Sequence, residues 1–223
     1  MNWKTKPTDR FVLKFIKVYL SAPISARVVK YFPNIRPAVC TCAGACLGMA
    51  GGLMFGLGYA CFGALAASLA QVLDGVDGQV ARLTGRVSSK GAMLDSFLDR
   101  YMDFSLIFGL YFHCLQFSTG LGDTERILGP GLLTLVAVLA VAGSSQISYS
   151  TARAASLKLD FQRPESAGKG SRTTAIILCG FLTPLWIHFP FIALLYLALH
   201  PNIAVISAMI RLQKTKDTHR STD

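Results

Sequence analysis

Six long apolar stretches, separated by short polar ones, run along this chain of 223 residues. An α-helix needs roughly 20 predominantly apolar residues to cross a bilayer, and most of the stretches approach that length. We expect helices over residues 38–58, 60–82, 91–115, 129–152, 173–188 and 190–210. The pattern therefore predicts an all-α, polytopic membrane protein with six transmembrane helices.

The segment before the first apolar stretch has a different pattern. Over residues 8–31, large apolar side chains recur at helical spacing, and lysines and arginines stand between them. A helix of this kind lies in the headgroup region, with its basic side chains reaching toward water. We therefore expect an interfacial amphipathic helix within an N-terminal region 1–36, then a membrane domain over 37–212 and a basic tail over 213–223.

Composition and charge support the membrane assignment. Hydrophobic residues make up 52% of the chain and charged residues only 15%, whereas soluble domains carry about a quarter charged residues. The net charge is +10, and lysine and arginine cluster at 4–36, 82–100, 153–172 and 211–220, with only Arg126 outside. In a six-span topology these four zones fall on one side, which is the pattern of cytoplasmic loops.

This distribution decides between the partners that a basic protein can have. The basic residues are explained by topology and by attraction to anionic membrane lipids, so we expect no nucleic-acid partner. Both termini and the loop between the second and third spans are expected in the cytoplasm. The predicted location is the inner or plasma membrane of a bacterium or archaeon.

Four aspartates stand at the junction of the second and third apolar stretches: Asp74, Asp77, Asp95 and Asp99. In two helices, the first pair shares one face and the second pair shares one face of the next helix. Carboxylates that converge in this way repel one another unless a cation lies among them. Oxygen ligands suit Mg²⁺, Mn²⁺ or Ca²⁺, and four of them could hold a pair of ions.

Small residues and one arginine share these faces, namely Gly78, Ala81 and Arg82 on the first helix and Gly91 at the start of the second. Small side chains let a ligand approach the backbone closely. Together with the aspartates they complete an eight-residue motif, Asp74-x2-Asp77-Gly78-x2-Ala81-Arg82-x8-Gly91-x3-Asp95-x3-Asp99.

This motif resembles the signature of the CDP-alcohol phosphotransferases at all eight positions, and the resemblance extends over about residues 8–172. It implies an enzyme of phospholipid biosynthesis that moves a substituted phosphoryl group, expected to be phosphatidyl, from a CDP-linked donor to an alcohol, with release of CMP. CDP-diacylglycerol is the expected donor. A homodimer is the expected assembly.

The resemblance also implies roles for the residues of the motif. Two divalent ions, Mg²⁺ or Mn²⁺, would be bound by the four aspartates. Asp95 and Asp99 would be catalytic, with Asp99 as the candidate base for the acceptor hydroxyl. The CDP-linked donor would contact the small residues and the arginine: Gly78, Ala81, Arg82 and Gly91.

The acceptor is expected near the end of the fourth span. The stretch Ser148-Tyr149-x3-Arg153-Ala154 resembles one that lines the acceptor pocket in the inositol-phosphate and glycerol-phosphate branches of the family, although this chain has Thr151 where those members often carry a basic residue. A guanidinium binds a phosphate dianion through two parallel hydrogen bonds. We therefore expect Arg153 and Arg172 to bind a phosphorylated polyol, and Lys169 to contact lipid headgroups.

Two other functions are compatible with these residues. One is a synthase of the di-inositol-phosphate type, with a soluble CDP-inositol donor. The other is a divalent-cation transporter, which should distribute polar groups through the depth of the bilayer, whereas the acids here stand at one end of the predicted spans. Metal-dependent release of CMP distinguishes the enzyme from the transporter.

Overall fold

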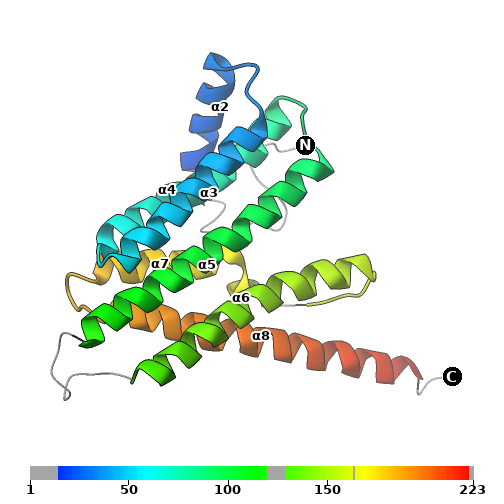
Figure 1. Ribbon diagram of the computed structural model, residues 1–223. Helices are drawn as coiled ribbons and strands as arrows, with labels where there is room; N and C mark the ends of the chain where they lie inside the picture. The colour runs from blue at the N-terminus through cyan, green and yellow to red at the C-terminus, as the bar shows by residue number, and fades with distance from the viewer. Residues whose placement is uncertain (1–14, 120–128, 163, 221–223) are drawn as a thin grey trace.

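The computed structural model describes residues 15–119, 129–162 and 164–220, and the elements found there are all helical (Figure 1). A π-helical turn, η1 (Ile16–Ser21), leads into α2 (Ala22–Tyr31), and a short 3-10 turn, η3 (Glu165–Ala167), precedes α7. The longer helices are α3 (Pro37–Gly56), α4 (Ala60–Leu83), α5 (Ser89–Thr119), α6 (Pro130–Ser156), α7 (Lys169–Leu182) and α8 (Phe189–Arg220).

Each of the six predicted spans coincides with one of the helices α3 to α8. Four of these, α3, α4, α6 and α8, are long and apolar enough to cross a membrane, within the described residues. Helix α7 has only 14 residues, and α5 carries charged side chains through its first half. Four candidate spans are therefore found, and the count of six stays a prediction.

The predicted fifth span, 173–188, differs most from the helix that the structure contains. Helix α7 begins at Lys169, directly after Gly168, and ends at Leu182. Pro184 follows two residues later, and it lacks the N–H that would continue the helix. The chain then turns and enters α8 at Phe189.

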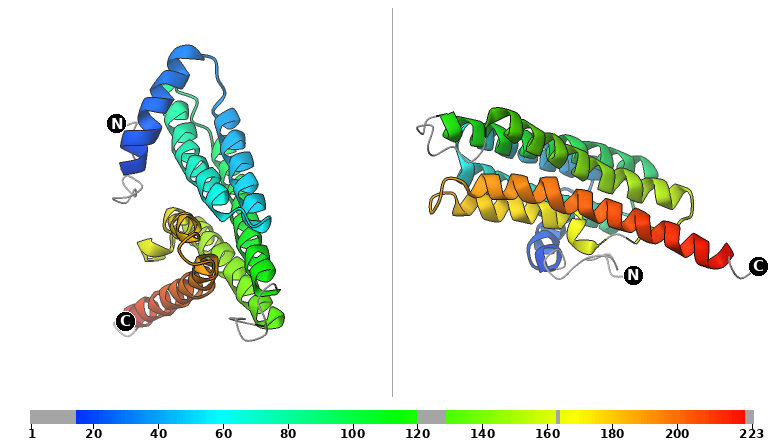
Figure 2. Two further views of the ribbon diagram at one scale, coloured as in Figure 1. Left: turned by 90° about the vertical axis from the view of Figure 1, so that its left-hand side faces the viewer. Right: turned by 90° about the horizontal axis from the view of Figure 1, so that it is seen from below.

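The helices form two groups that pack across one another (Figures 1 and 2). Helix α3 packs against α4 and α5, and α6 packs along α8. Contacts of α7 with α4 and of α5 with α6 join the two groups. The main apolar core lies where they meet, and it includes Phe55, Ala64, Leu106 and Leu194.

Glycines recur at every fourth position of α3, and the structure uses them for close packing. A Cβ placed on Gly52 would collide with the backbone of Ser105, and one on Gly109 of α5 would collide with the backbone of Gly52. A Cβ on Gly48 would meet the Met102 side chain. The stripe lets α3 and α5 approach closely.

The N-terminal segment is helical from Ile16 to Tyr31 and docks on α4 through polar side chains. The Ser25 hydroxyl donates to Gln79 Oε1 (2.8 Å), and Gln79 Nε2 donates to the Lys17 carbonyl (2.9 Å). Gln79 and Ser25 are fully buried. A Cβ on Gly75 would stand 2.9 Å from Ser21 Cβ, so glycine at this position permits the close approach.

This docking was not expected from the amphipathic pattern. The large apolar residues Phe15, Tyr19 and Leu20 are exposed, and the buried face consists of small residues. Residues 8–14 of the predicted helix lie outside the described part of the chain. The interfacial position of the segment stays a prediction.

Candidate active and metal site

A tight connection between α4 and α5 places the aspartates of both helices toward the same end of the bundle. Helix α4 ends at Leu83, and Gly85 adopts a left-handed conformation with φ +66°, which glycine reaches without strain. Arg86 Nη1 then donates to the carbonyls of Asn34 and Ile35, each at 3.0 Å. These hydrogen bonds attach the connection to the segment just before α3.

A pocket that opens to solvent lies among α3, α4, α5 and α7. Helix α3 contributes small residues to it, α4 and α5 contribute the aspartates, and α7 contributes one lysine. The lining comprises Thr41, Gly44, Ala45, Ala70, Asp74, Asp77, Asp95, Leu98, Asp99, Met102 and Lys169. All four predicted metal ligands therefore face one pocket.

Three of the aspartates form a tight cluster. One carboxylate oxygen from each of Asp74, Asp95 and Asp99 lies within 4.8 Å of the other two. Two oxygens bound to one Mg²⁺ at about 2.1 Å can be at most about 4.2 Å apart, so only small side-chain movements separate this arrangement from a binding site. The set contains only hard oxygen donors and therefore fits a divalent cation of the Mg²⁺ or Mn²⁺ type.

Asp77 completes the set from a more buried position. Its side chain accepts a hydrogen bond from the backbone N–H of Gly78. The Thr41 hydroxyl lies within hydrogen-bond reach of the Asp77 carboxylate and 3.3 Å from the Pro37 carbonyl oxygen. These contacts restrain the Asp77 carboxylate on the pocket wall.

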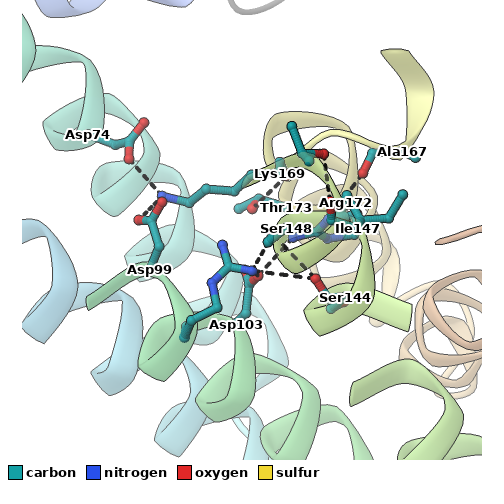
Figure 3. Close-up of polar contacts among 12 residues, drawn as sticks. Asp74, Asp99, Asp103, Ser144, Ile147, Ser148, Ala167, Lys169, Arg172 and Thr173 are labelled. Carbon is teal, nitrogen blue, oxygen red and sulfur yellow. Dashed lines mark hydrogen bonds and ion pairs between the residues drawn. The ribbon is translucent and has the colours of Figure 1, made fainter. Parts of the chain in front are cut away.

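Lys169 lies in the middle of the site (Figure 3). Its Nζ donates to Asp74 Oδ1 at 2.6 Å and also to Asp99 Oδ1. The sequence predicted that Lys169 contacts lipid headgroups, and that prediction is wrong, because its ammonium contacts two aspartates of the site. Because α7 begins at this residue and packs on α4, the side chain projects between the two acidic helices.

A second group of charges lies one turn further along α5. Asp103 accepts a hydrogen bond from Arg172 Nη2 at 2.8 Å, and Arg172 Nη1 donates to the Ala167 carbonyl at 3.0 Å. Arg100 Nη1 lies 3.5 Å from the same Asp103 oxygen and also donates to the Ser148 hydroxyl. Asp103 therefore pairs with both Arg172 and Arg100.

Neither of the two predicted acceptor-binding arginines is among the residues that line the pocket described above. Arg172 is 2% exposed and engaged by Asp103, so its guanidinium is not presented to a ligand. Arg153 stands exposed in the last turn of α6. The Ser148 hydroxyl, in the stretch predicted to line the acceptor pocket, is occupied by Arg100.

The predicted donor-binding residues leave free volume next to the aspartates. A Cβ on Gly78 would meet nothing closer than the Arg82 guanidinium at 3.5 Å, and one on Gly91 only Ser88 Oγ at 3.2 Å. Ala81 and Arg82 are half-buried on the same helix. Their contact with a CDP-linked donor stays a prediction.

Two residues of the site were missed by sequence reasoning. Thr41 lies one helical turn beyond Pro37, near the start of α3. Lys169 carried a weak signal, a Gly-Lys pair at the start of an apolar stretch.

Fold and site together define a helical membrane protein with a carboxylate-lined pocket at one end of its bundle. The chain belongs to the CDP-alcohol phosphatidyltransferase family, whose family model matches residues 34–211. It is thus a phosphotransferase of membrane phospholipid biosynthesis. The eight-residue motif had predicted this class.

Solved structures share the fold. The phosphatidylinositol phosphate synthase of Mycobacterium tuberculosis with CDP-DAG bound is 22% identical, with a TM-score of 0.70 over 86% of this chain and 93% of that chain. The same synthase in complex with manganese and citrate is 21% identical, with a TM-score of 0.72 over 87% and 89% of the two chains. A comparison with curated protein sequences finds no match.

Proposed function

We propose that the protein transfers a phosphatidyl group from a CDP-linked lipid to the hydroxyl of a phosphorylated polyol and releases CMP. The observation that carries this proposal is the convergence of Asp74, Asp77, Asp95 and Asp99 on one pocket at one end of the bundle. A lipid-linked donor is supported by the related fold of a synthase that binds CDP-DAG. A pocket at the end of membrane-length helices is open to such a donor.

The four aspartates would bind two divalent cations, Mg²⁺ or Mn²⁺. The Asp74, Asp95 and Asp99 cluster and the manganese complex of the related synthase support this assignment. Such ions, when bound, neutralise the pyrophosphate of the donor and the charge that develops on the leaving CMP. Asp77, held by Gly78 and next to Thr41, would keep its ligand oxygen in a fixed position.

Asp99 is the proposed base. It lies one turn further along α5 than Asp95, on the same face, and both line the pocket. Asp99 would accept the proton of the acceptor hydroxyl as that oxygen bonds to the β-phosphorus and the bond from phosphorus to CMP breaks. The small residues Gly78 and Gly91 would admit the donor beside the aspartates, and Arg82 would contact its pyrophosphate.

Arg153 is the proposed contact for the acceptor phosphate. It is exposed at the end of α6 and offers a guanidinium fork to a dianion. Arg172, by contrast, is engaged with Asp103, so its proposed role is to hold α7 in place. Acceptors of the inositol phosphate or glycerol 3-phosphate type fit this assignment better than unphosphorylated alcohols.

The test is a panel of donors and acceptors with the full-length protein in detergent or nanodiscs, read out as CMP release. We expect CMP from CDP-diacylglycerol with a phosphorylated polyol and Mg²⁺ or Mn²⁺, and none in EDTA. CMP formed only from CDP-inositol would favour the soluble-donor alternative. If no donor and acceptor pair yields metal-dependent CMP, the proposal is wrong.

A further inference from the structure

The Lys169 ammonium lies where a cation bound by Asp74 and Asp99 would lie. It contacts Oδ1 of both residues, and the Asp74 contact is 2.6 Å long. These two carboxylates also belong to the cluster with Asp95 whose oxygens lie within 4.8 Å of one another. The lysine side chain is 22% exposed, and the carboxylates are 31% and 19% exposed, so water screens the repulsion between the carboxylates only in part.

The ammonium and a divalent cation cannot use these oxygens together. An ion bound to both carboxylates would stand about 2.1 Å from each ligand oxygen, which is close to the position that Nζ occupies. An ammonium group and a divalent cation in nearly the same position would repel each other strongly in a partly buried site. Binding of the ion therefore requires that Nζ leave.

The surroundings of Lys169 permit that movement. Helix α7 is attached to α5 by the Arg172–Asp103 pair, which is three residues further along α7 and is buried. The backbone of Lys169 is therefore fixed. Its flexible four-carbon stem carries a compact point charge that can swing away without moving the helix.

We propose that Lys169 is a tethered counter-ion of the metal site, which a divalent cation displaces when it binds. This inference rests on the proposed metal role of the aspartates. Lys169 neutralises the mutual repulsion of the carboxylates until a metal replaces it, and it thereby lowers the apparent metal affinity. Binding of the metal and departure of the Lys169 ammonium from the carboxylates then occur together, as an exchange of one cation for the other.

Neutral variants test the exchange by metal binding, without an activity assay. Lys169→Met and Lys169→Gln should bind Mn²⁺ at least about ten-fold more tightly than the wild type. When Lys169 contacts the aspartates in about 90% of metal-free molecules, only about 10% can bind the ion directly, and the apparent affinity falls by that factor. They should also unfold at a lower temperature in EDTA and gain more stability from Mn²⁺. Lys158→Met, which removes an exposed lysine after α6, controls for the change in net charge.

The wild-type protein offers a second measurement. Mass spectrometry of amine acetylation should show faster labelling of Lys169 when Mn²⁺ is added, while labelling of Lys158 stays constant. Either neutral variant binding Mn²⁺ with wild-type or weaker affinity, or Lys169 labelling that does not rise with Mn²⁺, would overturn the exchange.

Binding of Mn²⁺ to Asp95→Asn separates this inference from the proposed function. If the wild type binds Mn²⁺ and Asp95→Asn binds it far more weakly, the aspartates are the metal site, and the Lys169 results then decide on the exchange alone. If both proteins bind Mn²⁺ equally, the metal assignment itself is wrong, and the exchange is overturned with it.

Discussion

Arg172 and Asp103 form a buried ion pair, 2.8 Å between Nη2 and Oδ2, that joins α7 to α5 beside the aspartate cluster. Arg172 is 2% exposed and Asp103 is 6% exposed. Lys169 lies one turn before Arg172 on the same helix, so this pair sets where the Lys169 side chain can reach. Arg172, which the sequence assigned to the acceptor, is thus engaged in a buried ion pair.

Removal of one partner of this pair should destabilise the protein strongly. Asp103→Asn leaves the buried Arg172 guanidinium without its counter-charge, and we expect a loss of about 3–5 kcal/mol in unfolding free energy. Asp160→Asn, at an exposed aspartate, is the matched control and should have little effect. Thermal unfolding in detergent measures both, and equal midpoints for the two variants would contradict the structural role of the pair.

The glycine stripe of α3 gives a prediction with an internal control. Gly52→Ala places a Cβ against the backbone of Ser105 in α5, whereas a Cβ on Gly56 would lie 3.7 Å from the nearest atom. We expect Gly52→Ala to cost about 1–3 kcal/mol by overpacking, and Gly56→Ala to be tolerated. Chemical or thermal unfolding of the two variants checks this, and the reverse order of stability would contradict the α3–α5 packing.

Docking of the N-terminal segment should depend on Gln79. Gln79→Leu leaves the buried Ser25 hydroxyl and the Lys17 carbonyl without this partner, and we expect a cost of about 1–3 kcal/mol. The segment should also become sensitive to limited proteolysis. Gln162→Leu, at an exposed glutamine, is the control. Wild-type protease resistance in Gln79→Leu would show that the segment is held by other contacts.

The sequence predicted those features that depend on local spacing. The shared faces of the aspartates follow from the 3.6-residue period, and in the structure all four carboxylates line one pocket. The membrane-length helices follow from apolar run length. The end of α7 was misplaced because the apolar pattern continues past Leu182, although Pro184 interrupts the helix.

Other features depend on helices that are distant in sequence. Lys169 meets Asp74 and Asp99 from 95 and 70 residues away. A basic residue at the start of an apolar helix has the same local pattern whether it faces headgroups or a carboxylate, and only the packing of α7 decides which. The docking of the N-terminal segment could not be predicted for the same reason, because the hydroxyls of Ser21 and Ser25 donate to Val72 and Gln79 of α4, more than 50 residues away.

If the aspartate pocket is the site of CMP release, a single substitution at Asp95 should abolish it. Asp95→Asn keeps the shape of a pocket-lining side chain and removes one anionic ligand from the cluster. With CDP-diacylglycerol, a phosphorylated polyol and saturating Mn²⁺, we expect CMP release to fall by at least about a hundred-fold, while Asp160→Asn retains wild-type activity. An Asp95→Asn protein that releases CMP at close to the wild-type rate would contradict the assignment of the site.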